Sequence, residues 1–260
     1  MAITSAFFAL FGFIFLITQY FQFVRGYGTL STGARILPVA LSIAVASVVG
    51  AVLAPRIGTK VVVSTGLLLF GASFVWISTV AVDASYATTI VPQMVLMGLG
   101  MGLISTPATE SILLVLPPAR AGVGSAVNDA TRILGGTLGV AVIGSIYASL
   151  YASQLSTALT VQLPQAAASA ANRSVGGAFG AATQLDAIGQ TGLARTLRDA
   201  ASTAFFHGFS TACLVAAAVS AVGAVLAGIL IPAQPPRPDE ARVAADRVVG
   251  EPAVARGDAS

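Results

Sequence analysis

Long apolar stretches separated by short polar breaks dominate the chain. A helix needs about 20 apolar residues to cross the roughly 30 Å hydrocarbon core of a bilayer. Six stretches meet or approach that length, at residues 3–24, 35–53, 61–82, 88–116, 123–150 and 203–231. Glycine and proline inside them are compatible with helices, because neighbouring helices satisfy the freed backbone groups. The pattern predicts an all-α integral membrane protein with six transmembrane helices.

The polar breaks predict how the chain is divided. Residues 1–150 hold five spans, and a long connection over 151–202, rich in Ala, Ser, Gln and Thr, leads to the sixth span at 203–231. Leu193 to Phe206, which leads from that connection into the last span, fits either an amphipathic helix or a mobile loop. The tail, 232–260, is Pro-rich and mixed in charge, which predicts disorder.

The distribution of Lys and Arg predicts an orientation, because cytoplasmic loops carry an excess of both. One side of the predicted topology holds Arg56, Lys60, Arg120, Arg237, Arg242 and Arg247. The other side holds Arg25 and Arg35, with three more arginines in the long connection. We therefore expect both termini in the cytoplasm and the long connection outside.

Composition agrees with a membrane protein and narrows its chemistry. Hydrophobic residues make up 56% of the chain and charged residues only 9%, against about 25% charged in soluble domains. The chain has a single cysteine and a single histidine, which disfavours a metal-binding site. It has no stripe of basic residues of the kind that binds nucleic acid. We expect no cofactor. The chain begins almost at the first span, without the pattern of a signal peptide, and this start is typical of the middle of a longer protein.

Four ionisable residues fall in or beside the spans. A charged side chain there costs free energy, so it is usually paired or placed on a water-filled cavity. Asp129 and Arg132 are three positions apart, one helical turn from each other. They fit either a local ion pair or a gating pair that rearranges during transport. Glu110 fits a partner for an arginine or a proton carrier, and His207 fits an interfacial side chain better than a pH switch.

One face of the first span has the character of a binding surface. Phe15, Gln19 and Gln22 recur at helical spacing, and aromatic rings with uncharged polar groups suit bulky apolar or cationic molecules. Gln93 and Met97 of the fourth span are expected to face the same space. The alternative for this face is ordinary helix packing with a few polar contacts.

Glycines in the fourth and fifth spans lack the strand and the Lys-Ser/Thr pair of a nucleotide loop. Small residues three or four positions apart instead predict close helix packing. These glycines are Gly98, Gly100, Gly102, Gly135, Gly136, Gly139 and Gly144.

The same two spans carry a family resemblance. The segments are Gly98 to Gly102, Thr106-Pro107-Ala108-Thr109, Pro117 to Gly122, Gly124 to Arg132 and Gly135 to Ala141. Together they resemble the last helices of the fourteen-span drug:proton antiporters of the major facilitator superfamily. Phe7 to Leu10, Thr18 to Gln22 and Leu37 to Ala40 resemble helices that open the C-terminal six-helix bundle of that family.

The resemblance implies a proton-coupled multidrug efflux protein of the bacterial plasma membrane, with drug-like compounds and protons as its partners. It implies that Phe15, Gln19 and Gln22 contact substrate and that Asp129 and Arg132 belong to a cytoplasmic gate. Arg56, Gly58 and Lys60 resemble the family's basic cytoplasmic loop, although Pro55 stands at its acidic position.

The family's N-terminal bundle has no counterpart in these residues, so a partner bundle is expected to complete the pathway. The first hypothesis is therefore the C-terminal half of an efflux antiporter. The alternative is a non-transporting remnant or a six-helix subunit that assembles with another bundle. An intramembrane enzyme has little support, because the spans lack a His-Glu-x-x-His or Ser/Lys arrangement.

Overall fold

The computed structural model describes residues 2–80, 84–113, 121–159 and 162–231, and every regular element in these ranges is helical. The elements are α1 (Ala2–Gln19), η1 (Tyr20–Val24), α2 (Thr29–Ile57), α3 (Thr59–Ser78), η2 (Tyr86–Ile90), α4 (Val91–Leu113), α5 (Ala121–Ala158), α6 (Gln165–Arg173), α7 (Val175–Ala187) and α8 (Thr191–Leu230). Six helices of the described residues are long and apolar enough to cross a membrane. The predicted all-α membrane bundle is confirmed.

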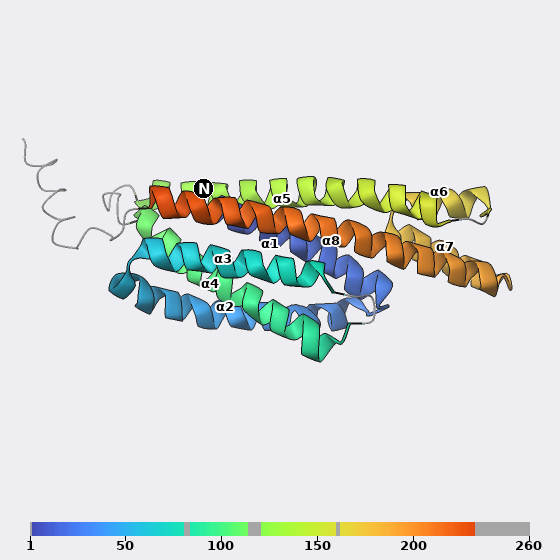
Figure 1. The fold of residues 1–260 in the computed structure, drawn as a ribbon, viewed down its shortest axis with the longest axis horizontal. Helices are drawn as coiled ribbons and strands as arrows, with labels where there is room; N and C mark the ends of the chain where they lie inside the picture. The colour runs from blue at the N-terminus through green and yellow to red at the C-terminus, as the bar shows by residue number, and fades with distance from the viewer. Residues whose placement is uncertain (1, 81–83, 114–120, 160–161, 232–260) are drawn as a thin grey trace, which may run out of the picture.

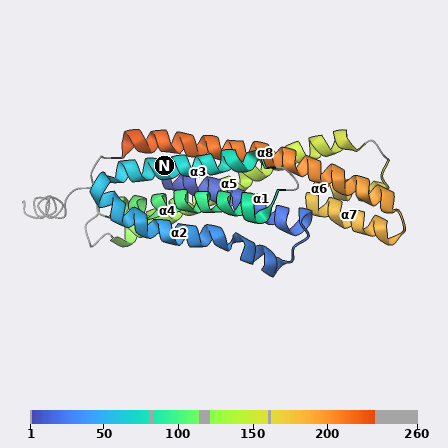
Figure 2. The same cartoon turned by 60° about the horizontal axis from the view of Figure 1, so that its bottom comes forward.

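The six long helices form one bundle (Figure 1). Helix α4 packs against α2 and α3, α8 packs against α3 and α5, and α1 packs against α5 and α8. The start of α1, the junction of α2 and α3, and the end of α8 lie at one end of the bundle, as two views show (Figures 1 and 2). The positive residues Arg56 and Lys60 therefore lie at the same end as the start of α1.

Glycines set how closely these helices approach. A Cβ atom on Gly98 would lie 2.5 Å from the Ser42 Cβ of α2, and one on Gly100 would lie 2.6 Å from the Phe70 backbone nitrogen of α3. Alternate glycines of α4 thus meet two different neighbours. The predicted packing role of the glycines is confirmed for this helix.

Helices α5 and α8 are much longer than the bilayer core. Their 38 and 40 residues correspond to about 57 and 60 Å at 1.5 Å per residue, roughly twice the core thickness. Both run past the other long helices, and α6 and α7 lie against their protruding ends (Figure 1). We call the described part of residues 151–202 the helical cap.

The helical cap has its own small core. Tyr151, Val175 and Leu197 are buried in it, and the Tyr151 hydroxyl donates to the Ala171 carbonyl at 3.2 Å. Ser174 caps α7 by accepting a hydrogen bond from the Gly177 amide at 3.0 Å. The connection therefore contains the amphipathic helix, since Leu193–Phe206 lies within α8.

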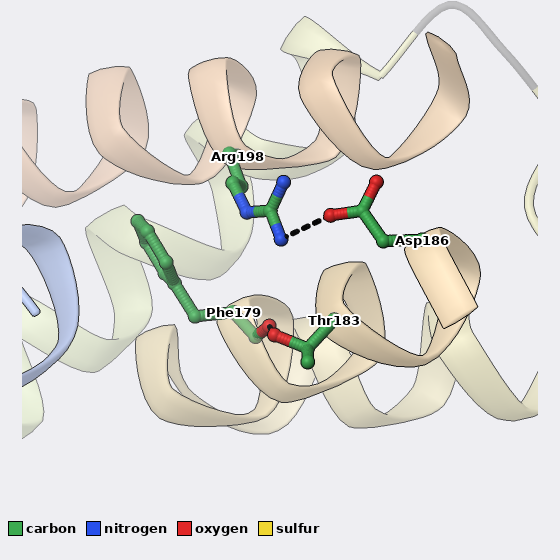
Figure 3. Close-up of polar contacts among 4 residues, drawn as sticks. All are labelled: Phe179, Thr183, Asp186 and Arg198. Carbon is green, nitrogen blue, oxygen red and sulfur yellow. Dashed lines mark hydrogen bonds and ion pairs between the residues drawn. The ribbon is translucent and has the colours of Figure 1, made fainter. Parts of the chain in front are cut away.

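An ion pair joins α7 to α8. Figure 3 shows Arg198 of α8 reaching Asp186 near the end of α7, with an Nη2–Oδ2 distance of 2.6 Å. Both side chains are about one third exposed, at 33% and 34%, so the pair contributes at most about 1 kcal/mol. The Thr183 hydroxyl, one turn before Asp186, donates to the Phe179 carbonyl within α7.

The bundle and the cap share an aromatic seam. Its rings lie 5.3 to 6.5 Å apart between centroids. They belong to Phe13, Tyr20, Phe21, Tyr147, Tyr151, Phe205, Phe206 and Phe209. A further contact comes from Phe23 of η1, whose ring would lie 2.8 Å from a Cβ on Gly176 of α7. The η1 segment is thereby in direct contact with the cap.

Candidate functional site

The side of α1 that carries Phe15 packs partly against α5. A Cβ on Gly12 would lie 2.3 Å from the Ile143 Cδ1 atom, and a Cβ on Gly139 would lie 2.0 Å from the Phe8 carbonyl oxygen. Helix packing therefore accounts for Phe8 and Gly12. Phe15 lies further along the same side and remains 38% exposed.

The predicted glutamines occupy different environments. Gln19 at the end of α1 and Gln22 in η1 are half-buried, and the Gln19 Nε2 is buried without a partner among the described residues. Gln93 is fully buried and donates from Nε2 to the Ser73 carbonyl of α3 at 3.3 Å. Met97, one turn beyond Gln93, is fully buried in the hydrophobic core. Gln93 and Met97 therefore lie inside the bundle rather than on an open face.

A cavity of about 540 Å³ lies between α1 and α5. Its size falls within the range of about 300–1,000 Å³ typical of small-molecule sites. It is lined by Phe7, Phe11, Asp129, Arg132, Ile133, Gly136, Thr137 and Val140. Gly136 leaves room for the Phe11 ring, which would lie 3.2 Å from a Cβ at that position. Two of the predicted gating residues, Asp129 and Arg132, thus line one cavity.

Arg132 connects three helices at this cavity. Its Nη2 donates to the Thr109 Oγ1 of α4 at 3.0 Å, and its guanidinium carbon lies 5.2 Å from the centre of the Phe7 ring of α1. The Arg132 Nε is buried without a partner among the described residues. These contacts hold the guanidinium by a hydroxyl and a ring face.

The expected ion pair between Asp129 and Arg132 is not formed within the described part of the chain. Arg132 is turned toward Thr109 instead, while Asp129 is an exposed side chain on the wall of the cavity. Spacing on a helix permits an i, i+3 pair but does not determine whether a neighbouring helix offers a competing contact. Here α4 offers that contact.

The remaining predicted residues lie away from this cavity wall. Glu110 is exposed on α4, one position after Thr109. Of the two arginines that could pair with it, Arg132 bonds Thr109 and Arg120 lies outside the described residues. His207 is exposed on α8, where its carbonyl accepts a hydrogen bond from Thr211.

The predicted cytoplasmic loop is a tight junction between α2 and α3. Gly58 is the one residue between the two helices, with φ of +93° and an amide that donates to the Ala54 carbonyl at 3.0 Å. A positive φ of this kind favours glycine. Arg56 is exposed and Lys60 is half-buried at this junction.

The sequence interpretation did not identify the cavity. Phe7 and Phe11 are one turn apart on α1, and Gly136 and Val140 are one turn apart on α5. That matched spacing was available as a signal. It did not reveal which face of α1 meets α5, and this choice is made by the close approach at Gly139.

Comparison with known proteins places the chain in a family. The family model described as Major Facilitator Superfamily matches residues 1–140. A multidrug resistance protein of Mycobacterium tuberculosis is 35% identical over 148 residues, which cover 56% of this chain and 27% of the relative. A multidrug efflux pump of Mycolicibacterium smegmatis is 30% identical over 220 residues, covering 85% of this chain and 42% of the relative.

A tetracenomycin C resistance and export protein of Streptomyces glaucescens is 28% identical over 234 residues, covering 88% of this chain and 42% of the relative. The matched segments thus span less than half the length of these relatives. The relatives are efflux, export and resistance proteins, in agreement with the prediction that the chain is not an enzyme. On the family match and the six membrane-length helices together, the chain is a multi-pass membrane protein that belongs to the Major Facilitator Superfamily.

Proposed function

We propose that this chain forms one helix bundle of a drug efflux transporter and supplies one wall of the pathway. The observation that carries the proposal is the cavity between α1 and α5, where apolar and aromatic groups surround Asp129 and Arg132. Mixed lining of this kind suits drug-sized compounds with polar groups. The efflux and resistance names of the relatives support the same substrate class.

The second wall comes from another bundle in this proposal. The relatives are more than twice as long as the segments they share with this chain. Helices α2 and α5 are the least buried of the six candidate spans, and they expose apolar side chains such as Leu41, Val48 and Leu138. A second bundle packed on these faces would enclose the open side of the cavity, and rocking of two bundles about a central site provides alternating access.

We also propose that efflux is driven by protons. Asp129 on the cavity wall and Glu110 on α4 are the carboxylates assigned to this coupling, because both are exposed near the same end of the bundle. In this proposal, Glu110→Gln and Asp129→Asn each reduce pH-driven dye movement. A matched change at Asp199, an exposed carboxylate of the helical cap, is expected to leave it unchanged.

The assigned substrate-contact residues are Phe15, Gln19 and Gln22, whereas Gln93 and Met97 are fully buried inside the bundle and are not assigned to substrate contact. Phe15 is accessible, and the Gln19 Nε2 is a buried donor without a partner among the described residues. Gln22→Ala in a complete transporter is expected to alter the export of some substrates. Unchanged export of every substrate would contradict this assignment.

The proposed orientation places both termini in the bacterial cytoplasm and the helical cap outside. Gly180 is exposed on α7, and a Cβ there would meet open space, so Gly180→Cys introduces a thiol with little disturbance. A membrane-impermeant maleimide added to intact cells is expected to label it. The native Cys213 is buried in α8 and serves as the internal control.

Efflux in a drug-hypersensitive host tests the central proposal. Three proteins are compared: this chain alone, the relative from Mycolicibacterium smegmatis without its matched segment, and a fusion of the two. We expect resistance only from the fusion. Resistance from this chain alone, or none from a fusion that reaches the membrane, would contradict the proposal.

A further inference from the structure

The two charged groups of the α1–α5 cavity are held apart. Arg132 is tethered to Thr109 and stacked over Phe7, while Asp129 lines the same cavity without an ion pair to Arg132 or to another described residue. Charged side chains within membrane-spanning segments cost free energy and are generally paired with another group. The cavity therefore presents one cationic and one anionic group that its own described walls leave unneutralised.

Apart from Thr137, the rest of the wall is apolar. Phe7 and Phe11 provide ring surface, Val140 provides aliphatic surface, and Gly136 leaves open space beside Phe11. A lipophilic cation would satisfy Asp129 but place its charge beside Arg132. A lipophilic anion would satisfy Arg132 but face Asp129. A molecule that carries both charges satisfies both groups.

We propose that this cavity binds a zwitterionic amphiphile. Its carboxylate or phosphate accepts hydrogen bonds from the Arg132 guanidinium, its amine donates to the Asp129 carboxylate, and its apolar body lies against Phe7 and Phe11. This inference rests on the proposed transport function for its meaning, since it names a class of transported compound. Its test measures binding alone, so its failure leaves the efflux test untouched.

Two sources carry this chemistry: the headgroup of phosphatidylethanolamine and a zwitterionic small molecule. The probe is Nε-dansyl-lysine, which has a fluorescent aromatic body, an amine and a carboxylate. Dansylcadaverine lacks the carboxylate, and N-dansyl-6-aminohexanoate lacks the amine. The full chain is placed in nanodiscs of phosphatidylglycerol, and dansyl fluorescence reports the dissociation constant of each probe.

Nε-dansyl-lysine is expected to bind at least about tenfold more tightly than either analogue, since a hydrogen bond to a charged group is worth about 1.5–3 kcal/mol. Arg132→Gln is expected to remove its advantage over dansylcadaverine. Asp129→Asn is expected to remove its advantage over the aminohexanoate probe. Arg195→Gln and Asp199→Asn, which remove exposed charges of the helical cap, are the matched controls and should leave all three constants within twofold.

Thr109→Val provides a variant that keeps both charges. Loss of the Thr109 hydroxyl frees Arg132 to pair with Asp129, so zwitterion affinity is expected to fall severalfold while the protein remains folded. Equal binding of the three probes, tightest binding of dansylcadaverine, or equal effects of Arg132→Gln and Arg195→Gln would overturn the proposal.

Nanodiscs of phosphatidylethanolamine then separate the two sources. If the lipid headgroup occupies the cavity, Nε-dansyl-lysine binds at least about tenfold more weakly in them, and Asp129→Asn removes the difference between the two lipids. If the dissociation constant is the same in both lipids, the occupant is a zwitterionic small molecule. Either result supports a zwitterion site, because both require the preference for Nε-dansyl-lysine.

Discussion

Gly139→Ala tests the closest contact between α1 and α5. A Cβ on Gly139 would lie 2.0 Å from the Phe8 carbonyl oxygen, 2.7 Å from the Phe8 carbonyl carbon and 2.8 Å from its Cα. All three are backbone atoms, so rotation of a side chain cannot relieve the clash. The two helices must separate by about 1 Å or more at this level, given that non-bonded carbon atoms prefer about 3.5–4.0 Å.

The magnitude follows from two opposing effects. Overpacking of this kind destabilises by about 1–3 kcal/mol, and alanine is a better helix former than glycine by up to about 1 kcal/mol. With a backbone obstacle at 2.0 Å, the clash dominates and a net loss of about 2 kcal/mol is expected. At about 2–4 °C per kcal/mol for a chain of this size, the midpoint of thermal unfolding should fall by about 4–8 °C.

Cys213 supplies the assay. It is the only cysteine of the chain and is 2% exposed in α8, so a thiol-reactive fluorogenic dye reports unfolding during heating. Gly122→Ala is the matched control on the same helix, because a Cβ on Gly122 meets open space. A midpoint for Gly139→Ala that is no lower than those of the wild type and of Gly122→Ala would refute the close approach of α1 and α5.

Three further experiments test other parts of the fold. Gly58→Ala places a side chain at φ of +93° and should destabilise by about 1–3 kcal/mol; a midpoint equal to the wild type would contradict the single-residue junction. Asp186→Ala and Arg198→Ala should show a coupling of about 0.2–1 kcal/mol in a double-mutant cycle, because both side chains are about one third exposed; coupling above about 2 kcal/mol would indicate a more buried pair. Tyr151→Phe removes the hydrogen bond to the Ala171 carbonyl and should weaken the cap by about 0.5–1.5 kcal/mol; hydrogen exchange of the α6 amides should accelerate, and unchanged exchange would contradict this contact.

The membrane spans were predictable because hydrophobicity and length determine them directly. The predicted span at 61–82, for example, corresponds to α3 over Thr59–Ser78. The family was also predictable, because most of the residues that carry the resemblance lie in the part of the chain that the family model matches. The ends of the fifth and sixth spans were not predictable in the same way. Both helices continue beyond the apolar stretch, since the alanine-rich connection has high helix propensity and a small core of its own.

The functional residues were less predictable than the spans. Arg132 and Asp129 were found because charge within a span is rare, but their separation depends on Thr109 of another helix. Gln93 is a residue type that often binds ligands, but its side-chain amide donates to the Ser73 carbonyl of α3. Such choices depend on how helices rotate against one another, and a single helical period does not specify that rotation.

The central claim is that this chain contributes one wall of a two-bundle pathway. The most direct measurement uses the purified chain in liposomes at less than one copy per vesicle, with an imposed pH gradient and a fluorescent compound that the fused transporter exports. In a single bundle the α1–α5 cavity is open on one side, and the Phe15 side chain is exposed. We therefore predict no gradient-driven accumulation of the compound by the chain alone. Accumulation that requires the gradient and is carried out by the monomer would contradict the claim.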